Sequence, residues 1–133
     1  MNRGFTLLEL LIVVIVIGIL ATLAIPSYNR SKEQALGKEA LTNLRLIAAA
    51  EKIYRMETTT FWPSAGTSWS LAEINSNLRL YLTTTNWTWS ITGAIGPPPT
   101  FTASADRNGS GGYLDCQYTI NQTGTEWSAA SCP

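Results

Sequence analysis

The apolar positions of the chain gather in one long run near its start. Residues 5–25 contain only three polar side chains, Thr6, Glu9 and Thr22. As a helix rising about 1.5 Å per residue, this run is long enough to cross the roughly 30 Å hydrocarbon core of a bilayer. The pattern therefore predicts a helix that can span a membrane.

After Pro26 the pattern becomes amphipathic with a helical period. Apolar side chains recur at steps of three, four or seven residues, at Leu36, Ala40, Leu44, Ile47 and Tyr54. We therefore expect one long helix from Phe5 to about Glu57. Pro26 lacks a backbone donor and should kink or loosen it, which leaves two interpretations: a hinge within one helix, or a break between two helices.

Two features of the amphipathic half bear on its stability. Gly37 lies in the helix interior, where glycine costs about 1 kcal/mol relative to alanine. Glu51 and Arg55 are four residues apart, a spacing that predicts an ion pair on one helix face.

Beyond the helix, turn residues and a period of two indicate a small sheet. A loop over Thr58–Trp69 leads to Ser70, which with Glu73 forms a capping-box pattern that opens a short helix to about Leu78. Alternation then predicts three half-buried strands and a weaker fourth, at Trp87–Thr92, Phe101–Ala105, Leu114–Ile120 and Thr125–Ser128. The expected fold class is α+β, a long helix packed on an antiparallel sheet.

The tryptophans of this region divide into two groups. Trp87 and Trp89 share one face of a predicted strand, so we expect both in the core, while Trp62 and Trp69 lie in the predicted loop and are expected to be exposed. Sugar binding and electron hopping are two functions that so many tryptophan and tyrosine side chains can suggest. Core packing is the interpretation favoured for most of them.

Composition argues against an enzyme. The chain of 133 residues has 9 basic and 9 acidic side chains and no histidine, so it lacks the commonest general base and a basic surface for nucleic acid. We expect no catalytic residues, no cofactor and no metal. The run from Asp106 to Gly111 matches the first half of a calcium loop, but Gln117 stands where the bidentate carboxylate belongs, which favours a hairpin turn.

Two cysteines, Cys116 and Cys132, lie near the end of the chain. In a protein exported behind a membrane helix, such a pair indicates a disulfide, with two free thiols as the alternative. Closing a loop of about 15 residues stabilises a fold by roughly 3 kcal/mol in the chain-entropy model.

The start of the chain resembles the class III leader of type IV pilins. A secretory signal places its small cleavage-site residue after the apolar run, whereas Gly4 precedes it here. The resemblance is most specific over Gly4–Pro26 and implies cleavage between Gly4 and Phe5, N-methylation of Phe5, and a helix hinge at Pro26.

Glu9 has a special place in this resemblance. A carboxylate within an apolar membrane helix costs about 2.5–3.5 kcal/mol, so it usually has a partner or a function. No basic side chain occurs between Phe5 and Asn29, which leaves the α-amine of Phe5, its own or a neighbour's, as the available cation. The resemblance implies assembly through Glu9 of an incoming subunit and the Phe5 amine of an assembled one. The alternative is a carboxylate favoured only by the helix dipole.

The resemblance also implies a domain plan and a function. Residues 1–4 would be the leader, 5–26 the transmembrane and polymerisation helix, 27–57 the amphipathic half, and 58–133 the loop, short helix and sheet of a pilin fold with a C-terminal disulfide loop. The chain would be a structural subunit of a type IV pilus-like filament. Its expected partners are itself, a prepilin peptidase, the inner membrane and an assembly platform there, and its expected final location is the cell surface. A type II secretion pseudopilin and a membrane-anchored monomer are the alternatives.

Overall fold

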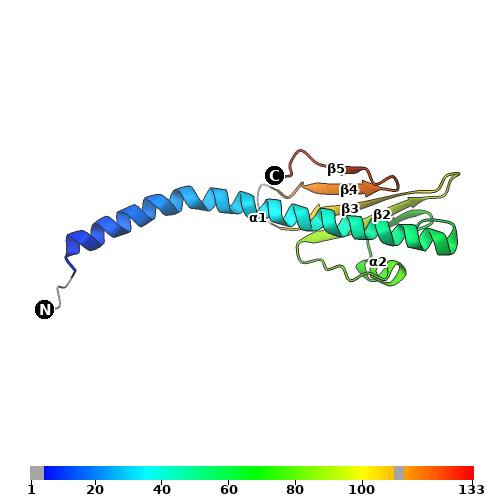
Figure 1. The fold of residues 1–133 in the computed structure, drawn as a ribbon, viewed down its shortest axis with the longest axis horizontal. Helices are drawn as coiled ribbons and strands as arrows, with labels where there is room; N and C mark the ends of the chain where they lie inside the picture. Colours follow the sequence, from blue (N-terminus) through cyan, green and yellow to red (C-terminus); the bar gives the residue numbers. More distant parts are fainter. Residues whose placement is uncertain (1–4, 110–112) are drawn as a thin grey trace. The chain divides into compact units, whose positions relative to one another are not determined.

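The computed structural model describes residues 5–109 and 113–133 of the chain. Helix α1 (Leu7–Thr58) is followed by a five-stranded antiparallel sheet whose strand order is the order of the sequence, with a short helix α2 after the first strand (Figure 1). The predicted α+β fold is confirmed. Gly4 and residues 110–112, where the sequence predicts a turn, lie outside the described residues.

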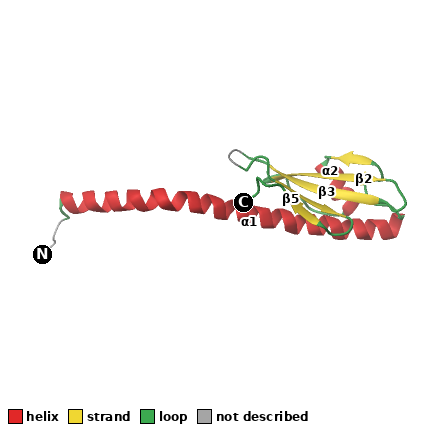
Figure 2. Ribbon diagram, turned by 90° about the horizontal axis from the view of Figure 1, so that it is seen from above, coloured by secondary structure: helices red, strands yellow, loops and turns green. Residues whose placement is uncertain are grey.

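The chain divides into two compact units, Met1–Gln34 and Ala35–Pro133. In the first unit α1 begins at Leu7, and it passes through Pro26 without interruption (Figure 2). The predicted single helix is confirmed, and a break between two helices at Pro26 is wrong. Pro26 cannot donate a hydrogen bond to the carbonyl of the preceding turn, which weakens the helix there. Its role as a hinge stays a prediction.

In the second unit the later turns of α1 pack against one face of the sheet. The predicted apolar stripe supplies Ala40, Leu44 and Ile47, all fully buried. Against them lie side chains from alternate positions of the strands, as a pleated sheet requires: Trp87, Trp89, Ile91, Phe101, Ala103, Ala105, Tyr118 and Ile120. The core positions expected for Trp87 and Trp89 are confirmed.

The strands extend the predicted ones or shorten them. They are β2 (Trp87–Ala94), β3 (Thr100–Arg107), β4 (Gln117–Asn121) and β5 (Glu126–Ser128). Residue Leu114, expected on the buried face of a strand, is 53% exposed because β4 begins only at Gln117. The predicted turn after β4 is present, with the Asn121 side-chain oxygen accepting from the Thr123 and Thr125 N–H groups at 3.0 Å.

Strand β1 (Gly66–Ser68) was predicted to be loop, and that prediction is wrong. It pairs with β2 in a register that sets Gly66 opposite Gly93. A Cβ at Gly93 would overlap the Pro63 carbonyl oxygen and lie 2.9 Å from its carbon. The pairing of β1 with β2 therefore depends on Gly93, which is distant from β1 in the sequence. The alternation of apolar and polar residues within β1 does not reveal this dependence.

Helix α2 (Leu71–Leu78) begins at the predicted cap. The Ser70 hydroxyl accepts from the Glu73 N–H at 3.4 Å. The Glu73 carboxylate accepts from the Ser68 hydroxyl at 2.9 Å and so links α2 to β1. The helix ends at Arg79, which adopts a left-handed conformation with φ of 55°.

The disulfide between Cys116 and Cys132 is present, with a Cα–Cα distance of 4.7 Å. It ties the end of the chain to the residue just before β4. A loop of this size is stabilised by about 3 kcal/mol in the chain-entropy model. The predicted bridge is confirmed.

Gly37 has a packing role that its helix position hides. It is buried, and a Cβ there would overlap the Tyr118 hydroxyl and lie 3.1 Å from Cζ of the ring. We expect Gly37→Ala to lower the free energy of unfolding by about 1–3 kcal/mol through overpacking, although alanine favours a helix elsewhere. Denaturant unfolding checks this. In a Tyr118→Phe background the loss should shrink, and a gain in stability from Gly37→Ala would contradict the contact.

Candidate assembly site

The apolar start of α1 is uncovered. The large apolar side chains from Phe5 to Ile25 are exposed by 49% to 90%, and no described residue packs over them. By length and composition α1 can cross a membrane. A soluble monomer rarely exposes so large a contiguous apolar surface, so this segment needs lipid or other protein chains around it.

Glu9 lies at the start of this surface and closes a reciprocal cap. The Thr6 hydroxyl accepts from the Glu9 N–H at 3.3 Å, and the Glu9 carboxylate accepts from the Thr6 N–H at 3.5 Å. This is a capping box, T-x-x-E, a pattern that was readable in the sequence and was missed there. The cap gives the N–H groups of Thr6 and Glu9 side-chain acceptors at the start of the helix.

The cap leaves the charge of Glu9 without a cation. Among the described residues no basic side chain pairs with it, and its bond to Thr6 is long. A carboxylate has about four acceptor sites, so one such bond leaves room for an ammonium group. A chain starting at Phe5 would carry its amine one residue before the cap. The structure thus joins Thr6 and Glu9 by hydrogen bonds, with Phe5 next to Thr6 in the chain, and places Pro26 farther along the same helix.

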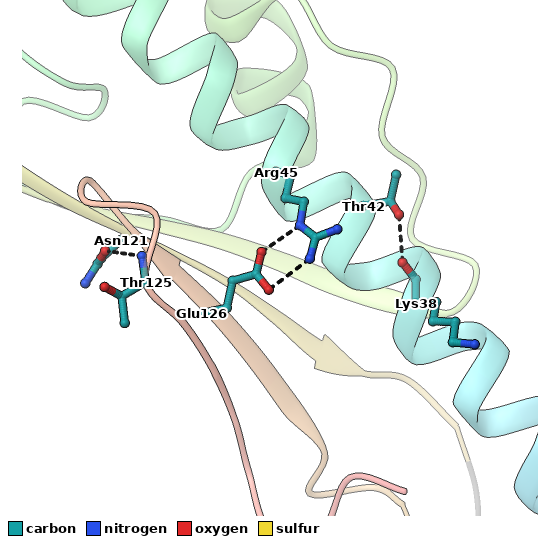
Figure 3. A network of polar contacts seen from close by, with 6 residues as sticks. All are labelled: Lys38, Thr42, Arg45, Asn121, Thr125 and Glu126. Carbon is teal, nitrogen blue, oxygen red and sulfur yellow. Dashed lines mark hydrogen bonds and ion pairs between the residues drawn. The ribbon is translucent and has the colours of Figure 1, made fainter.

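In the second unit, a charged pair fastens the last strand to α1. The Arg45 guanidinium donates two hydrogen bonds to the Glu126 carboxylate, at 2.6 and 3.1 Å (Figure 3). This bond holds the pKa of Glu126 below its usual value. Such bidentate geometry is specific as well as attractive, so it fixes the edge strand β5 against the helix.

Glu51 is buried in the core and does not pair with Arg55. Its carboxylate accepts from the Trp62 N–H at 2.9 Å, and its other oxygen has no hydrogen-bond partner. Arg55 instead lies over the Phe61 ring at 5.0 Å. The predicted ion pair is therefore wrong, because the helix face that carries Glu51 is covered by the loop after α1.

The buried carboxylate makes stability depend on pH. Burial raises the pKa of Glu51 from 4.5 to about 7, although the Trp62 bond acts to lower it. Between these values the folded chain binds more protons than the unfolded chain, so stability should fall as pH rises, by up to about 3 kcal/mol in total. Unfolding at pH 5 and at pH 8 measures this change. In Glu51→Gln the fall should be largely absent, and an unchanged fall would refute the assignment to Glu51.

The acidic side chains of the described residues do not gather into a metal site. Among residues 5–109 and 113–133, no three acidic, cysteine or histidine side chains are grouped to hold a metal ion. Asp106 lies in β3 opposite Gln117 of β4, and its carboxylate accepts from the Gln117 amide at 2.6 Å. These contacts belong to a strand pair. Residues 110 and 111 of the calcium-like pattern lie outside the described residues.

Comparison with known proteins shows similarity at the N-terminal end of the chain. The prokaryotic N-terminal methylation motif matches residues 1–25. The type IV major pilin protein PilA of Myxococcus xanthus is 48% identical over 56 residues, which cover 42% of this chain and 26% of that protein. Type II secretion system core protein G is 32% identical over 60 residues in Pectobacterium carotovorum and 36% over 56 residues in Escherichia coli.

These matches are partial. The match to the Pectobacterium protein covers 45% of this chain and 38% of that protein. The match to the Escherichia coli protein covers 42% of this chain and 39% of that protein. The chain therefore spans less than half the length of each relative. No solved structure matches the chain. The chain thus carries the prokaryotic N-terminal methylation motif, and over up to 45% of its length it is similar to a type IV major pilin and to type II secretion system core protein G.

Proposed function

We propose that the protein is a structural subunit that polymerises through residues 5–25 into a type IV pilus-like filament on the cell surface. The observation that carries this proposal is the exposed apolar segment of α1 with one carboxylate, Glu9, that no described cation neutralises. Packing these segments together would cover the apolar surface, and the amine of a neighbouring Phe5 would neutralise the charge.

Before assembly the subunit would lie in the inner membrane, held by the same segment. A prepilin peptidase would remove residues 1–4 and leave Phe5 as the methylated first residue. An assembly platform in that membrane would then add subunits to the filament. The match of the methylation motif to residues 1–25, which include Gly4 and Phe5, supports these steps.

A type II secretion pseudopilin is the second candidate, favoured by the matches to core protein G. It would use the same apolar helix in a shorter periplasmic assembly. The bridged segment that ends at Cys132 favours the pilus subunit, because the major pilins that the chain resembles usually carry such a segment.

Cleavage between Gly4 and Phe5 is expected of both the pilus subunit and the pseudopilin, so it distinguishes these two candidates from a membrane-anchored monomer. Mass spectrometry of the protein from its native host should find Phe5 at the N-terminus, with one added methyl group. A substitution of Gly4 by valine should block this cleavage, since a side chain would obstruct the bond that the peptidase must reach. A mature N-terminus at Met1, or one beyond Ala24, would contradict the proposal.

A further inference from the structure

Trp62 and Trp69 lie at a groove beside β1. Trp69 is 61% exposed as predicted, whereas Trp62 is half-buried and packs against the core, so its predicted exposure is wrong. The groove has a volume of about 540 Å³ and is lined by both rings and by polar side chains of β1 and α2. These polar residues are Thr67, Ser68, Ser70, Glu73 and Asn77.

Hydrogen bonds to neighbouring side chains and backbone hold the polar side chains of the groove in place. Ser68 donates to the Glu73 carboxylate at 2.9 Å, and the Asn77 amide donates to the Glu73 backbone carbonyl at 2.9 Å. Each keeps further capacity, because a carboxylate has about four acceptor sites and an amide has two donors and an acceptor oxygen. A ligand would therefore meet oriented donors and acceptors at little cost in side-chain entropy.

The charge of the groove restricts what it can bind. Glu73 is the single charged residue among those that line it, so phosphate, sulfate and carboxylate groups are repelled. Lysine and arginine, which form strong charge-assisted hydrogen bonds with such anions, are absent from the lining. Aromatic faces attract C–H groups through the negative face of their quadrupole, and hydroxyl groups of a ligand suit mixed donors and acceptors.

We propose that this groove binds a neutral sugar, with a pyranose ring stacked on Trp69 and its hydroxyls bonded to Glu73 and Asn77. The proposal concerns residues of the second unit alone and does not rest on filament assembly. A sugar offers both an apolar C–H face and a rim of hydroxyls, which matches tryptophan beside a carboxylate and an amide.

The test is saturation-transfer NMR on the full chain in a detergent without a sugar headgroup. The probes are cellotetraose, maltotetraose, mannotetraose and tetraacetylchitotetraose, with sialyllactose as an anionic probe and a proline decamer as a peptide probe. Trp69→Ala should weaken binding of the recognised neutral probe about tenfold, and Glu73→Gln should also weaken it. Trp127→Ala is the matched control, because Trp127 is 56% exposed on β5 and does not line the groove.

The expected result is saturation transfer to at least one neutral tetrasaccharide, with binding weakened about tenfold in Trp69→Ala and unchanged in Trp127→Ala. Transfer to none of the neutral probes would overturn the proposal. So would equal loss in both tryptophan variants, or a preference for the proline decamer, which would make the groove a peptide site.

Discussion

Replacing Glu9 by glutamine is expected to abolish filaments while leaving the protein in the membrane. The substitution removes a charge that costs about 2.5–3.5 kcal/mol within an apolar helix, so insertion should be unchanged or improved. Assembly should fail because the amine of a neighbouring subunit would be buried without its counter-ion. Filament yield by electron microscopy and membrane content by fractionation measure the two effects.

Glutamine separates the charge of Glu9 from its capping role. A capping box accepts either glutamate or glutamine, so Glu9→Gln keeps the bond to the Thr6 N–H and removes only the charge. Thr6→Ala is the matched control, because it removes the hydroxyl that accepts from the Glu9 N–H and leaves the charge. We expect Thr6→Ala to form filaments. Normal filament yield from Glu9→Gln, or equal loss from both variants, would mean that charge pairing is not the mechanism.

Removing residues 1–34 is expected to give a soluble monomer. The second unit, Ala35–Pro133, contains the whole buried core and the disulfide. It loses the membrane-scale apolar surface. The exposed apolar side chains of Leu46 and Ile53 remain, but they line one groove and do not form a surface that could span a membrane. Sedimentation should give the mass of one chain, with a cooperative unfolding transition. Filaments formed by this truncated chain would show that the first unit is not the polymerising element.

Local patterns predicted most of the fold because they act over a few residues. The period of the apolar stripe identified α1 and its buried face at Ala40, Leu44 and Ile47, and Ser70 marked the start of α2. The alternation of apolar and polar residues placed Trp87 and Trp89 on the buried face of one strand, which is also a local pattern. The disulfide followed from having two cysteines near the chain end.

Contacts between distant segments could not be predicted in this way. Strand β1 exists because Gly93 admits the Pro63 carbonyl, and Gly37 is buried because Tyr118 lies against it. The spacing of Glu51 and Arg55 predicted an ion pair, but Glu51 is buried and accepts from the N–H of Trp62 in the loop after α1, a contact that local spacing does not reveal. At the candidate site, the sequence located Glu9 and its apolar surroundings, whereas its cap by Thr6 was visible as a pattern and overlooked.

The central claim is that the apolar helices form the filament interior and that Glu9 meets an amine there. Electron cryomicroscopy of filaments sheared from the native host tests it directly. We predict filaments in which the chain begins at Phe5 and residues 5–25 of the subunits pack together inside. The Glu9 carboxylate of one subunit should form an ion pair with the Phe5 amine of a neighbouring subunit. Filaments held by contacts of the second unit alone, with Glu9 far from every amine, would contradict the account.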